Sequence, residues 1–300
     1  MSDSLVQRGS RQLGPDLSVG PLGFGCWRLT SGLADAQVII GAALDAGMNL
    51  IDNADVYGLD WGGSGFGACE ELLGEVLGAD PALRDQMVLA TKGGIVPPVP
   101  YDSSASAITA ACEASLRRLQ TDVIDVYQIH RPDMYAHPAE VAGALTALRA
   151  AGKIREVGVS NYTVDQYDAL AALLDFPMVS TQPQYAVNHL DPMRDGTFDR
   201  AMRDGVTPLA WSPLAGGAVV TGEGLPAELM VVLDELASRE NVDRAAIAIA
   251  FVLAHPSAPV AILGTQNPER LRSSLVALDV QLDRSDVYRI VQASEGVPLP

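Results

Sequence analysis

Short apolar segments alternate along this chain with longer segments whose apolar residues recur at helical spacing, and this alternation restricts the possible folds most strongly. Eight strands, each followed by a helix, predict a (β/α)8 TIM barrel of the α/β class. The expected strands are 21–26, 48–51, 87–92, 123–130, 154–160, 178–184, 206–211 and 259–264. The expected helices are 34–47, 68–78, 104–119, 138–150, 164–174, 196–203, 227–239, 244–254, 268–277 and 285–294.

The ends of the chain add to the repeating pattern. Residues 11–20 indicate a polar hairpin or turn before the first strand, and extra C-terminal helices are expected after the last one. The glycine-rich residues 212–226 are expected to form a long loop. No change of composition marks a linker, so residues 1–300 are expected to form a single domain. A doubly wound parallel sheet is the alternative fold.

The charge balance restricts the partners of the chain. The sequence has 20 Lys and Arg against 37 Asp and Glu, which gives a formal net charge of −17. Binding to nucleic acid requires clustered basic residues, and a field of this sign repels anionic membrane surfaces, so neither partner is expected. Nothing in the sequence specifies an oligomeric state.

The sequence shows no signal for export or for insertion into a membrane. Residues 1–10 lack an apolar core, which argues against a secretory signal, and the longest apolar run, 245–254, is too short to span a bilayer. The cysteines are odd in number and form neither a disulfide framework nor a CxxC motif, so a reducing cytoplasm is the expected location. They are Cys26, Cys69 and Cys112.

Polar side chains stand at the ends of five consecutive expected strands. Because the carboxyl ends of all strands in such a barrel lie on one rim, where barrel enzymes place their active sites, we expect these side chains to form one site. Tyr57, in the polar turn after the second strand, is expected beside them. In chain order the strand-end residues are Asp52, Lys92, His130, Ser160 with Asn161, and Gln184.

Two glycine-rich segments, 63–68 and 222–227, fit a loose GxGxxA pattern. Neither follows a convincing strand, and Pro226 interrupts the second, so a Rossmann dinucleotide site is not expected. Trp27 and Trp61 lie in or just before loops over the expected barrel mouth. They either line a pocket there or pack against the scaffold.

A metal site is an alternative chemistry for some of these residues. Asp52, Asp55 and His130 carry ligand atoms for a divalent ion, as in metal-dependent barrel hydrolases. No HxH pair accompanies them, and Lys92 would compete for the carboxylate. We therefore expect no metal, and a metal-assisted hydrolase would instead lose activity in chelator.

Seven motifs, in the order in which the chain carries them, resemble those of the aldo-keto reductase family. The resemblance covers nearly the whole chain. The resemblance implies that NAD(P)H gives hydride to an aldehyde or ketone while a tyrosine donates a proton to the developing alkoxide. The expected partner is a small carbonyl compound. The motifs are Asp52-Asn-Ala-Asp-Val-Tyr57-Gly, Thr91-Lys92, Ile129-His130-Arg-Pro-Asp, Gly152-Lys-Ile-Arg-Glu-Val-Gly-Val-Ser160-Asn161, Gln182-Pro-Gln184-Tyr, Trp211-Ser212-Pro-Leu214 and Gly264-Thr265-Gln-Asn-Pro-Glu-Arg270.

The resemblance assigns catalytic roles to Asp52, Tyr57, Lys92 and His130. Tyrosine, with a pKa of about 10, is a weak acid at neutral pH, but a neighbouring cation stabilises its phenolate. Lys92 would supply that cation, and Asp52 would hold Lys92 in place. His130 would orient and polarise the substrate carbonyl.

The resemblance also implies a cofactor site, with NADPH preferred over NADH. Ser160, Asn161 and Gln184 would bind the nicotinamide carboxamide, and Trp211 would stack on the nicotinamide ring. Ser212 and Leu214 begin the loop expected over the pyrophosphate. Thr265 and Arg270 would reach the adenosine 2′-phosphate, beside Gly264, where many family members have a lysine.

The sequence leaves two questions open. The glycine-rich insertion 62–67 beside Tyr57 has no family counterpart, so the physiological substrate is not defined. A regulatory protein that binds the cofactor on the same fold and turns over little is the alternative function. The presence of all four catalytic residues favours the enzyme.

Overall fold

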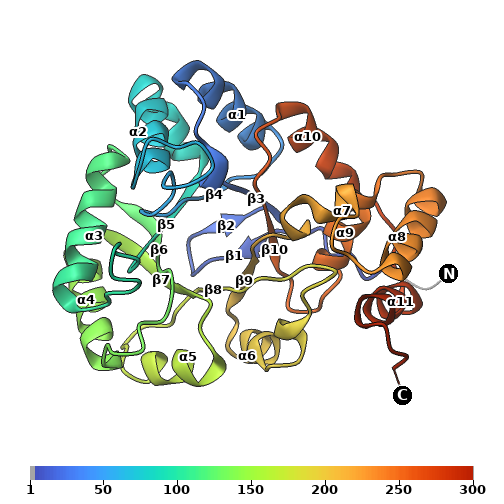
Figure 1. The fold of residues 1–300 in the computed structure, drawn as a ribbon. Helices are drawn as coiled ribbons and strands as arrows, with labels where there is room; N and C mark the ends of the chain where they lie inside the picture. Colours follow the sequence, from blue (N-terminus) through green and yellow to red (C-terminus); the bar gives the residue numbers. More distant parts are fainter. Residues whose placement is uncertain (1–3, 300) are drawn as a thin grey trace.

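The computed structural model describes residues 4–299. Its centre is a closed barrel of eight parallel strands in the order β10-β3-β4-β5-β6-β7-β8-β9 (Figure 1). The barrel confirms the predicted TIM-barrel fold. The strands are β3 (Leu22–Gly25), β4 (Leu50–Asp52), β5 (Val88–Gly93), β6 (Ile124–Ile129), β7 (Ile154–Ser160), β8 (Ser180–Gln182), β9 (Thr207–Ala210) and β10 (Val260–Leu263).

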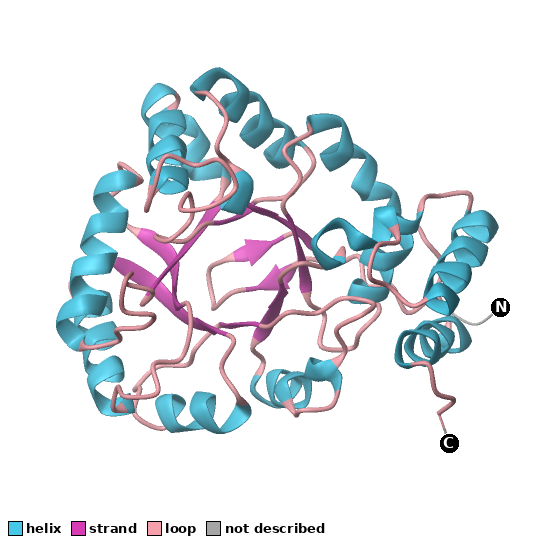
Figure 2. Cartoon of the chain, viewed as in Figure 1, coloured by secondary structure: helices cyan, strands magenta, loops and turns pink. Residues whose placement is uncertain are grey.

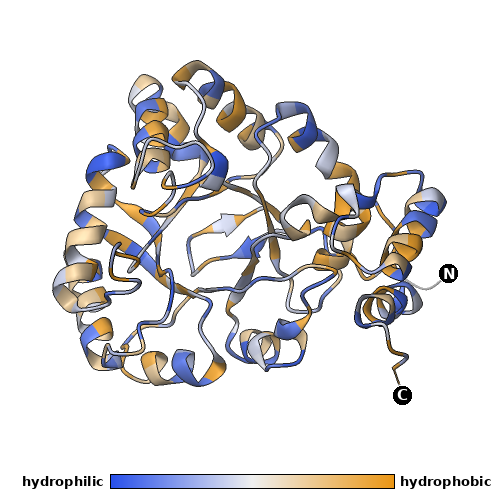
Figure 3. Cartoon of the chain, viewed as in Figure 1, coloured by the Kyte–Doolittle hydropathy of each residue, from blue (hydrophilic) through white to orange (hydrophobic). Residues whose placement is uncertain are grey.

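Helices surround the barrel and cover its outer face (Figure 2). They carry both hydrophobic and hydrophilic residues, because one face packs on the strands and the other meets water (Figure 3). They are α1 (Leu33–Asp45), α2 (Ala68–Ala79), α3 (Ala105–Arg118), α4 (Pro138–Ala150), α5 (Val164–Ala171), α6 (Thr197–Asp204), α7 (Ala218–Thr221), α8 (Ala227–Glu240), α9 (Arg244–Leu253), α10 (Pro268–Ser273) and α11 (Arg284–Glu295).

The sequence predicted a hairpin or turn before the first strand, and the structure has a short antiparallel hairpin there, which closes one end of the barrel. It consists of β1 (Arg11–Gln12) and β2 (Ser18–Val19) and is visible through the centre of the ring in Figure 2. Leu13 and Leu17 of the hairpin join one buried apolar cluster with inward-facing strand residues such as Val126. This plug fills the amino-terminal end of the barrel, so polar residues can gather only at the opposite end.

Some predicted elements differ from the structure at their ends. The strand expected at 178–184 contains only Ser180–Gln182, because Pro183 has no N–H to continue the ladder. The helix expected at 268–277 is α10 followed by a 3-10 helix, Ser274–Leu278. Cys26, placed in the first strand by the sequence, instead begins the 3-10 helix Cys26–Arg28.

The segment 212–226 is not a continuous loop, as the sequence had suggested. It contains a 3-10 turn (Ala215–Gly217) and α7, which end in glycines with left-handed backbone conformations. Val219 of α7 is fully buried and anchors the segment on the core. The prediction failed here because glycines obscure the apolar signal of so short a helix.

Candidate active site

The structure brings the polar residues of the strand ends to one rim of the barrel. Asp52 ends β4, Lys92 lies one residue before the end of β5, and His130 directly follows β6. Ser160 ends β7, and Gln184 lies two residues beyond β8. Since all eight strands run parallel, these positions meet at the carboxyl end, opposite the hairpin.

Lys92 is the centre of this site, and its side chain is fully buried. Its ammonium group donates to Asp52 Oδ2 at 2.7 Å, to the carbonyl oxygen of Asn53 at 2.8 Å and to the hydroxyl of Tyr57 at 3.1 Å. Lysine has three N–H donors, and each has a partner here. The buried charge is therefore compensated and held in one orientation.

Two glutamines complete the shell around Asp52. Asp52 Oδ1 accepts hydrogen bonds from Gln182 Nε2 at 3.0 Å and from Gln128 Nε2 at 3.4 Å. Neither glutamine is among the site residues expected from the sequence. Gln128 precedes His130 by two residues, so the period of a strand already places both on the same face, and this signal could have identified it.

The turn that carries Tyr57 is fixed against the start of α2. The Tyr57 N–H donates to the carbonyl oxygen of Ala54 at 3.1 Å, and the Tyr57 carbonyl oxygen accepts from the N–H of Cys69 at 3.3 Å. The amide of Asn53 donates to the Cys69 carbonyl oxygen at 3.1 Å. The position of the tyrosine hydroxyl is thus set by backbone contacts rather than by a free loop.

The electrostatic setting of Tyr57 is a balance of two effects. Burial raises the pKa of the Tyr57 hydroxyl, and the neighbouring Lys92 ammonium opposes that rise. Lys92 acts in the direction that the sequence predicted, but burial outweighs it, so the pKa of Tyr57 is raised overall. The hydroxyl therefore keeps its proton at neutral pH.

His130 lies edge-on to Tyr57, with ring centroids 5.7 Å apart and planes at 80°. Burial lowers the pKa of His130 well below its usual value, and the positive charges of Lys92 and Arg131 lower it further. Among residues 4–299, Nδ1 of this imidazole has no hydrogen-bond partner. His130 is therefore a neutral ring beside the Tyr57 hydroxyl.

The alternative metal site requires a cluster of ligand side chains. Within the described residues 4–299, no group of three or more His, Cys, Asp or Glu side chains is arranged to hold an ion. Asp55, a candidate ligand in that reading, donates its backbone N–H to the Lys92 carbonyl oxygen at 3.0 Å. Burial and then the charge of Glu70 raise the pKa of the Asp55 carboxyl to about 8.

Three of the predicted cofactor residues form one hydrogen-bonded group beside the catalytic rim. Asn161 Nδ2 donates to Ser160 Oγ at 2.7 Å, and Trp211 Nε1 donates to Asn161 Oδ1 at 3.0 Å. Asn161 adopts a left-handed backbone conformation with φ of 58°, which asparagine tolerates better than most residues. Gln184 pairs through its backbone with Trp211.

The other predicted cofactor residues lie on two neighbouring segments. Ser212 has a φ of 55°, and its hydroxyl accepts from the N–H of Gly216 at 2.8 Å, while Leu214 is partly buried. Gly264 and Arg270 are exposed, and a Cβ on Gly264 would meet open space. Thr265 Oγ1 accepts from the N–H of Asn267 at 3.3 Å. Within residues 4–299, no hydrogen bond or ion pair joins the side chains of these two segments to Asp52, Tyr57, Lys92 or His130.

These residues fit an extended dinucleotide. The indole of Trp211 is half-buried and fixed at its N–H, which leaves an aromatic surface beside the amide of Asn161. Within residues 4–299, the guanidinium of Arg270 makes no ion pair or side-chain hydrogen bond. An unpaired exposed cation at the position of Arg270 suits a phosphate group of the dinucleotide.

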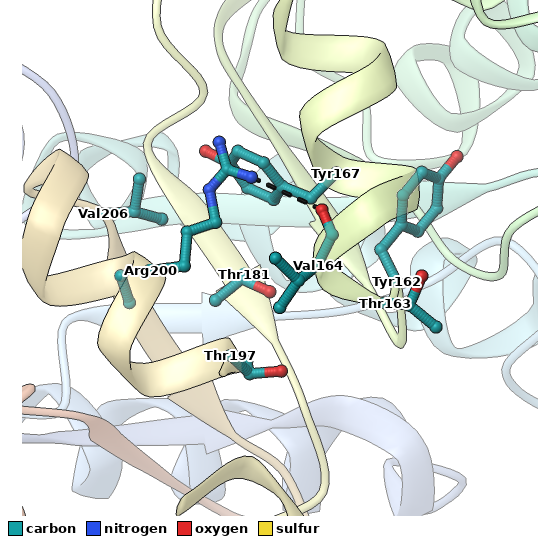
Figure 4. A pocket seen from close by; sticks show the side chains of 9 residues that line it. Tyr162, Thr163, Val164, Tyr167, Thr181, Thr197, Arg200 and Val206 are labelled. Atoms are coloured by element: carbon teal, nitrogen blue, oxygen red, sulfur yellow. Dashed lines mark hydrogen bonds between the residues drawn. The ribbon is translucent and has the colours of Figure 1, made fainter. Parts of the chain in front are cut away.

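A small pocket lies between α5 and α6, apart from the catalytic residues (Figure 4). Its one cation, Arg200, lies 3.8 Å over the ring of Tyr167 and is paired with Asp168 and Asp204. Figure 4 also shows its hydrogen bond to the Val164 carbonyl oxygen. Because its charge is satisfied within the protein, we assign this pocket no ligand.

The fold is that of a barrel oxidoreductase, and its candidate site surrounds a buried lysine. The chain belongs to the aldo/keto reductase family, whose family model matches residues 21–295. It is therefore an enzyme that acts on carbonyl or alcohol groups of small molecules, and the family uses NAD(P)H. No helix within residues 4–299 has the length and apolar character needed to cross a membrane.

Three similar proteins indicate how close the relationship is. A 6-dehydroglucose reductase from Novosphingobium aromaticivorans is 45% identical, with 100% of both chains covered. A 6-dehydroglucose reductase from Agrobacterium fabrum is 35% identical over 95% of this chain and 97% of that protein. The crystal structure of the thermostable aldo-keto reductase Tm1743 with the inhibitor epalrestat has a TM-score of 0.81 and 25% identity, covering 95% of this chain and 99% of that one.

Proposed function

We propose that this enzyme reduces the aldehyde of 6-dehydroglucose, or of a closely similar sugar, to the alcohol with NADPH, and that Tyr57 donates the proton. The observation that carries the catalytic part is the contact of 3.1 Å between Lys92 Nζ and the Tyr57 hydroxyl, in a buried site. The names of two relatives, 45% and 35% identical to this chain, support the substrate. Formation of the alcohol at C6 gives glucose.

Each residue of the site has a separate role in proton transfer. The cofactor, when bound, supplies the hydride. Tyr57 donates its proton to the carbonyl oxygen as negative charge develops there, and Lys92 stabilises the phenolate that remains. Asp52 keeps Lys92 charged and in position, since burial alone would lower the pKa of the lysine, whereas its pKa is raised overall. His130, as a neutral ring, donates an N–H to the same oxygen.

The cofactor residues would fix which face of the nicotinamide points at the carbonyl. Trp211 would stack on the ring, while Ser160, Asn161 and Gln184 would bind its carboxamide. The turn that contains Ser212, in a left-handed conformation, and Leu214 would cover the pyrophosphate. Gly264, Thr265 and Arg270 would lie at the adenosine end.

The neutral state of His130 predicts a flat pH dependence near neutrality. Its pKa is lowered well below 6.5, so it does not change charge as pH rises through the usual histidine range. We expect kcat at saturating NADPH to stay constant between about pH 6 and 8. A steady-state pH series measures this. An inflection near 6.5 that disappears in His130→Gln would show that the histidine is charged during turnover.

We expect NADPH to be preferred over NADH, with the preference depending on Arg270. The cofactors differ by one phosphate, which a protein with a net charge of −17 repels unless a local cation compensates. Arg270→Ala should weaken NADPH binding by about 1.5 to 3 kcal/mol, the range of a charge-assisted hydrogen bond, and leave NADH binding nearly unchanged. Fluorescence titration of both cofactors measures the two dissociation constants.

The neighbouring Arg272 provides a matched control for this experiment. It lies on the same short helix α10. Arg272→Ala should alter the binding of neither cofactor. The preference should also shrink as salt is raised, because the contact is exposed. Equal losses for NADPH and NADH in Arg270→Ala would mean that Arg270 supports the loop or the adenine and not the phosphate.

A regulatory role with little turnover is the competing function. Both functions require cofactor binding, so only turnover separates them. The decisive assay is NADPH oxidation by the wild-type enzyme with 6-dehydroglucose, alongside a panel of simple aldehydes, ketones and dicarbonyls. Cofactor binding without turnover of any carbonyl compound would favour the regulatory protein.

A further inference from the structure

An exposed aromatic cluster lies on the segments that follow β3 and β4, and the steps above do not use it. Trp27 follows β3, and Trp61 lies in the loop after β4. Their ring centroids are 5.1 Å apart with planes at 73°. The guanidinium of Arg28 lies 4.2 Å from the centroid of Trp61 and 5.5 Å from that of Trp27. Trp27 is 38% exposed and Trp61 53% exposed.

Hydrogen bonds hold this cluster in a defined shape. Trp27 Nε1 donates to Asp60 Oδ1 at 3.2 Å, and the Thr30 hydroxyl donates to the Trp61 carbonyl oxygen at 3.3 Å. Trp61 has a φ of 57°, a left-handed conformation that is unfavourable for a bulky residue. Such a conformation persists only where surrounding contacts impose it, and it is found most often where a side chain is positioned for binding.

The cluster is linked to the catalytic turn through one residue. The N–H of Cys69 donates to the Tyr57 carbonyl oxygen at 3.3 Å, and its thiol contacts the Trp27 carbonyl oxygen at 3.9 Å. The insertion also folds back on the turn, since the Gly65 N–H donates to the Gly58 carbonyl oxygen at 3.1 Å. Cys69 thus joins the turn that carries Tyr57 to the segment that carries Trp27, and this places the backbone of the aromatic cluster beside that turn.

The exposed groups match the two sides of a sugar. A pyranose has faces of C–H groups, which pack on an indole, and an edge of hydroxyls that need both donors and acceptors. Within residues 4–299, Oδ2 of Asp60 has no hydrogen-bond partner and Arg28 has no ion-pair partner. One carboxylate and one guanidinium balance in charge, which favours a neutral polyhydroxylated molecule over a strongly charged one.

We propose that Asp60 and Trp61 form a subsite for the ring of a sugar aldehyde, with the indole packed on its C–H face and the carboxylate accepting from its hydroxyls. This inference rests on the proposed function and specifies which residues select its substrate. The loop of residues 58–67, which carries Asp60 and Trp61 directly before the insertion, is then the specificity loop of the enzyme. A small apolar aldehyde would use Tyr57 and His130 but would gain little from this subsite.

The test compares 6-dehydroglucose with propanal. We expect Trp61→Ala to lower the ratio of the two kcat/KM values, sugar to propanal, by about tenfold or more, mainly through KM for the sugar. Asp60→Asn should also lower this ratio, but by a smaller factor than Trp61→Ala. Phe66→Ala is the matched control, since Phe66 is an exposed aromatic of the same segment that lies instead against Arg118. It should leave the ratio unchanged.

A conservative variant separates binding from loop structure. Trp61→Phe keeps an aromatic face and should recover most of the selectivity that Trp61→Ala loses. Equal losses for both aldehydes in Trp61→Ala, or no loss for the sugar, would overturn the subsite while leaving the proposed function intact. A wild-type enzyme that reduces propanal but not the sugar aldehyde would instead overturn the proposed substrate, and the subsite with it.

Discussion

Tyr57→Phe is expected to lower kcat/KM for aldehyde reduction by about a hundredfold or more, which is the usual loss when a general acid is removed. The substitution deletes one oxygen atom and keeps the ring that faces His130 at 5.7 Å. Lys92 keeps its bonds to Asp52 and to the carbonyl oxygen of Asn53, so the buried charge stays compensated. The variant should therefore fold and bind NADPH as the wild type does.

Stopped-flow or steady-state oxidation of NADPH measures the loss, and fluorescence titration measures cofactor binding. Tyr135→Phe provides the control, because Tyr135 is 96% exposed in the loop after β6 and lacks any contact with the catalytic group in the described residues. It should retain wild-type activity. Reduction of aldehydes by Tyr57→Phe at near wild-type rate would show that another group donates the proton.

The barrel could be predicted from the sequence because its physical signal is repeated. Each parallel strand is buried on both faces and so forms an apolar run, and each helix shows its own period. Eight repetitions of this strand and helix pattern leave few alternative folds. The element ends carried less information: β8 stops at Gln182 because of Pro183, and α7 is a helix of four residues bounded by glycines.

The grouping of the candidate residues on one rim could also be predicted, because all strand ends of a parallel barrel meet there. The contacts within it could not. Gln182 and Asp52 are separated by 130 positions in the chain, and only the closure of the barrel brings them to 3.0 Å. The pKa of Tyr57 depends on how burial balances the charge of Lys92, and the sequence shows the charge without the burial. The conformation of the loop that carries Trp61 likewise depends on contacts with residues that are distant from it in the sequence, such as Thr30.

Lys92→Met is expected to reduce kcat by about a hundredfold or more, since the cation that stabilises the Tyr57 phenolate is lost. Burial already raises the pKa of Tyr57, and Lys92 is the group that opposes the rise most. Its removal raises that pKa further. The alkaline limb of the pH profile for reduction, where Tyr57 loses its proton, should therefore move to higher pH. An unchanged profile in a still-active variant would reject the coupling.

The same substitution leaves the Asp52 carboxylate buried without its cation, which costs about 3 to 5 kcal/mol of stability. The pKa of Lys92 is raised in the folded state, so its stabilising contribution is complete below the ordinary lysine pKa and disappears only above the raised value. Loss of this pair thus destabilises the variant at neutral pH. The double variant Asp52→Asn/Lys92→Met removes both charges, and thermal melts should show that it recovers part of the stability. If its activity recovered as well, the lysine would serve only to neutralise Asp52; we expect the double variant to remain inactive because Tyr57 still lacks its cation.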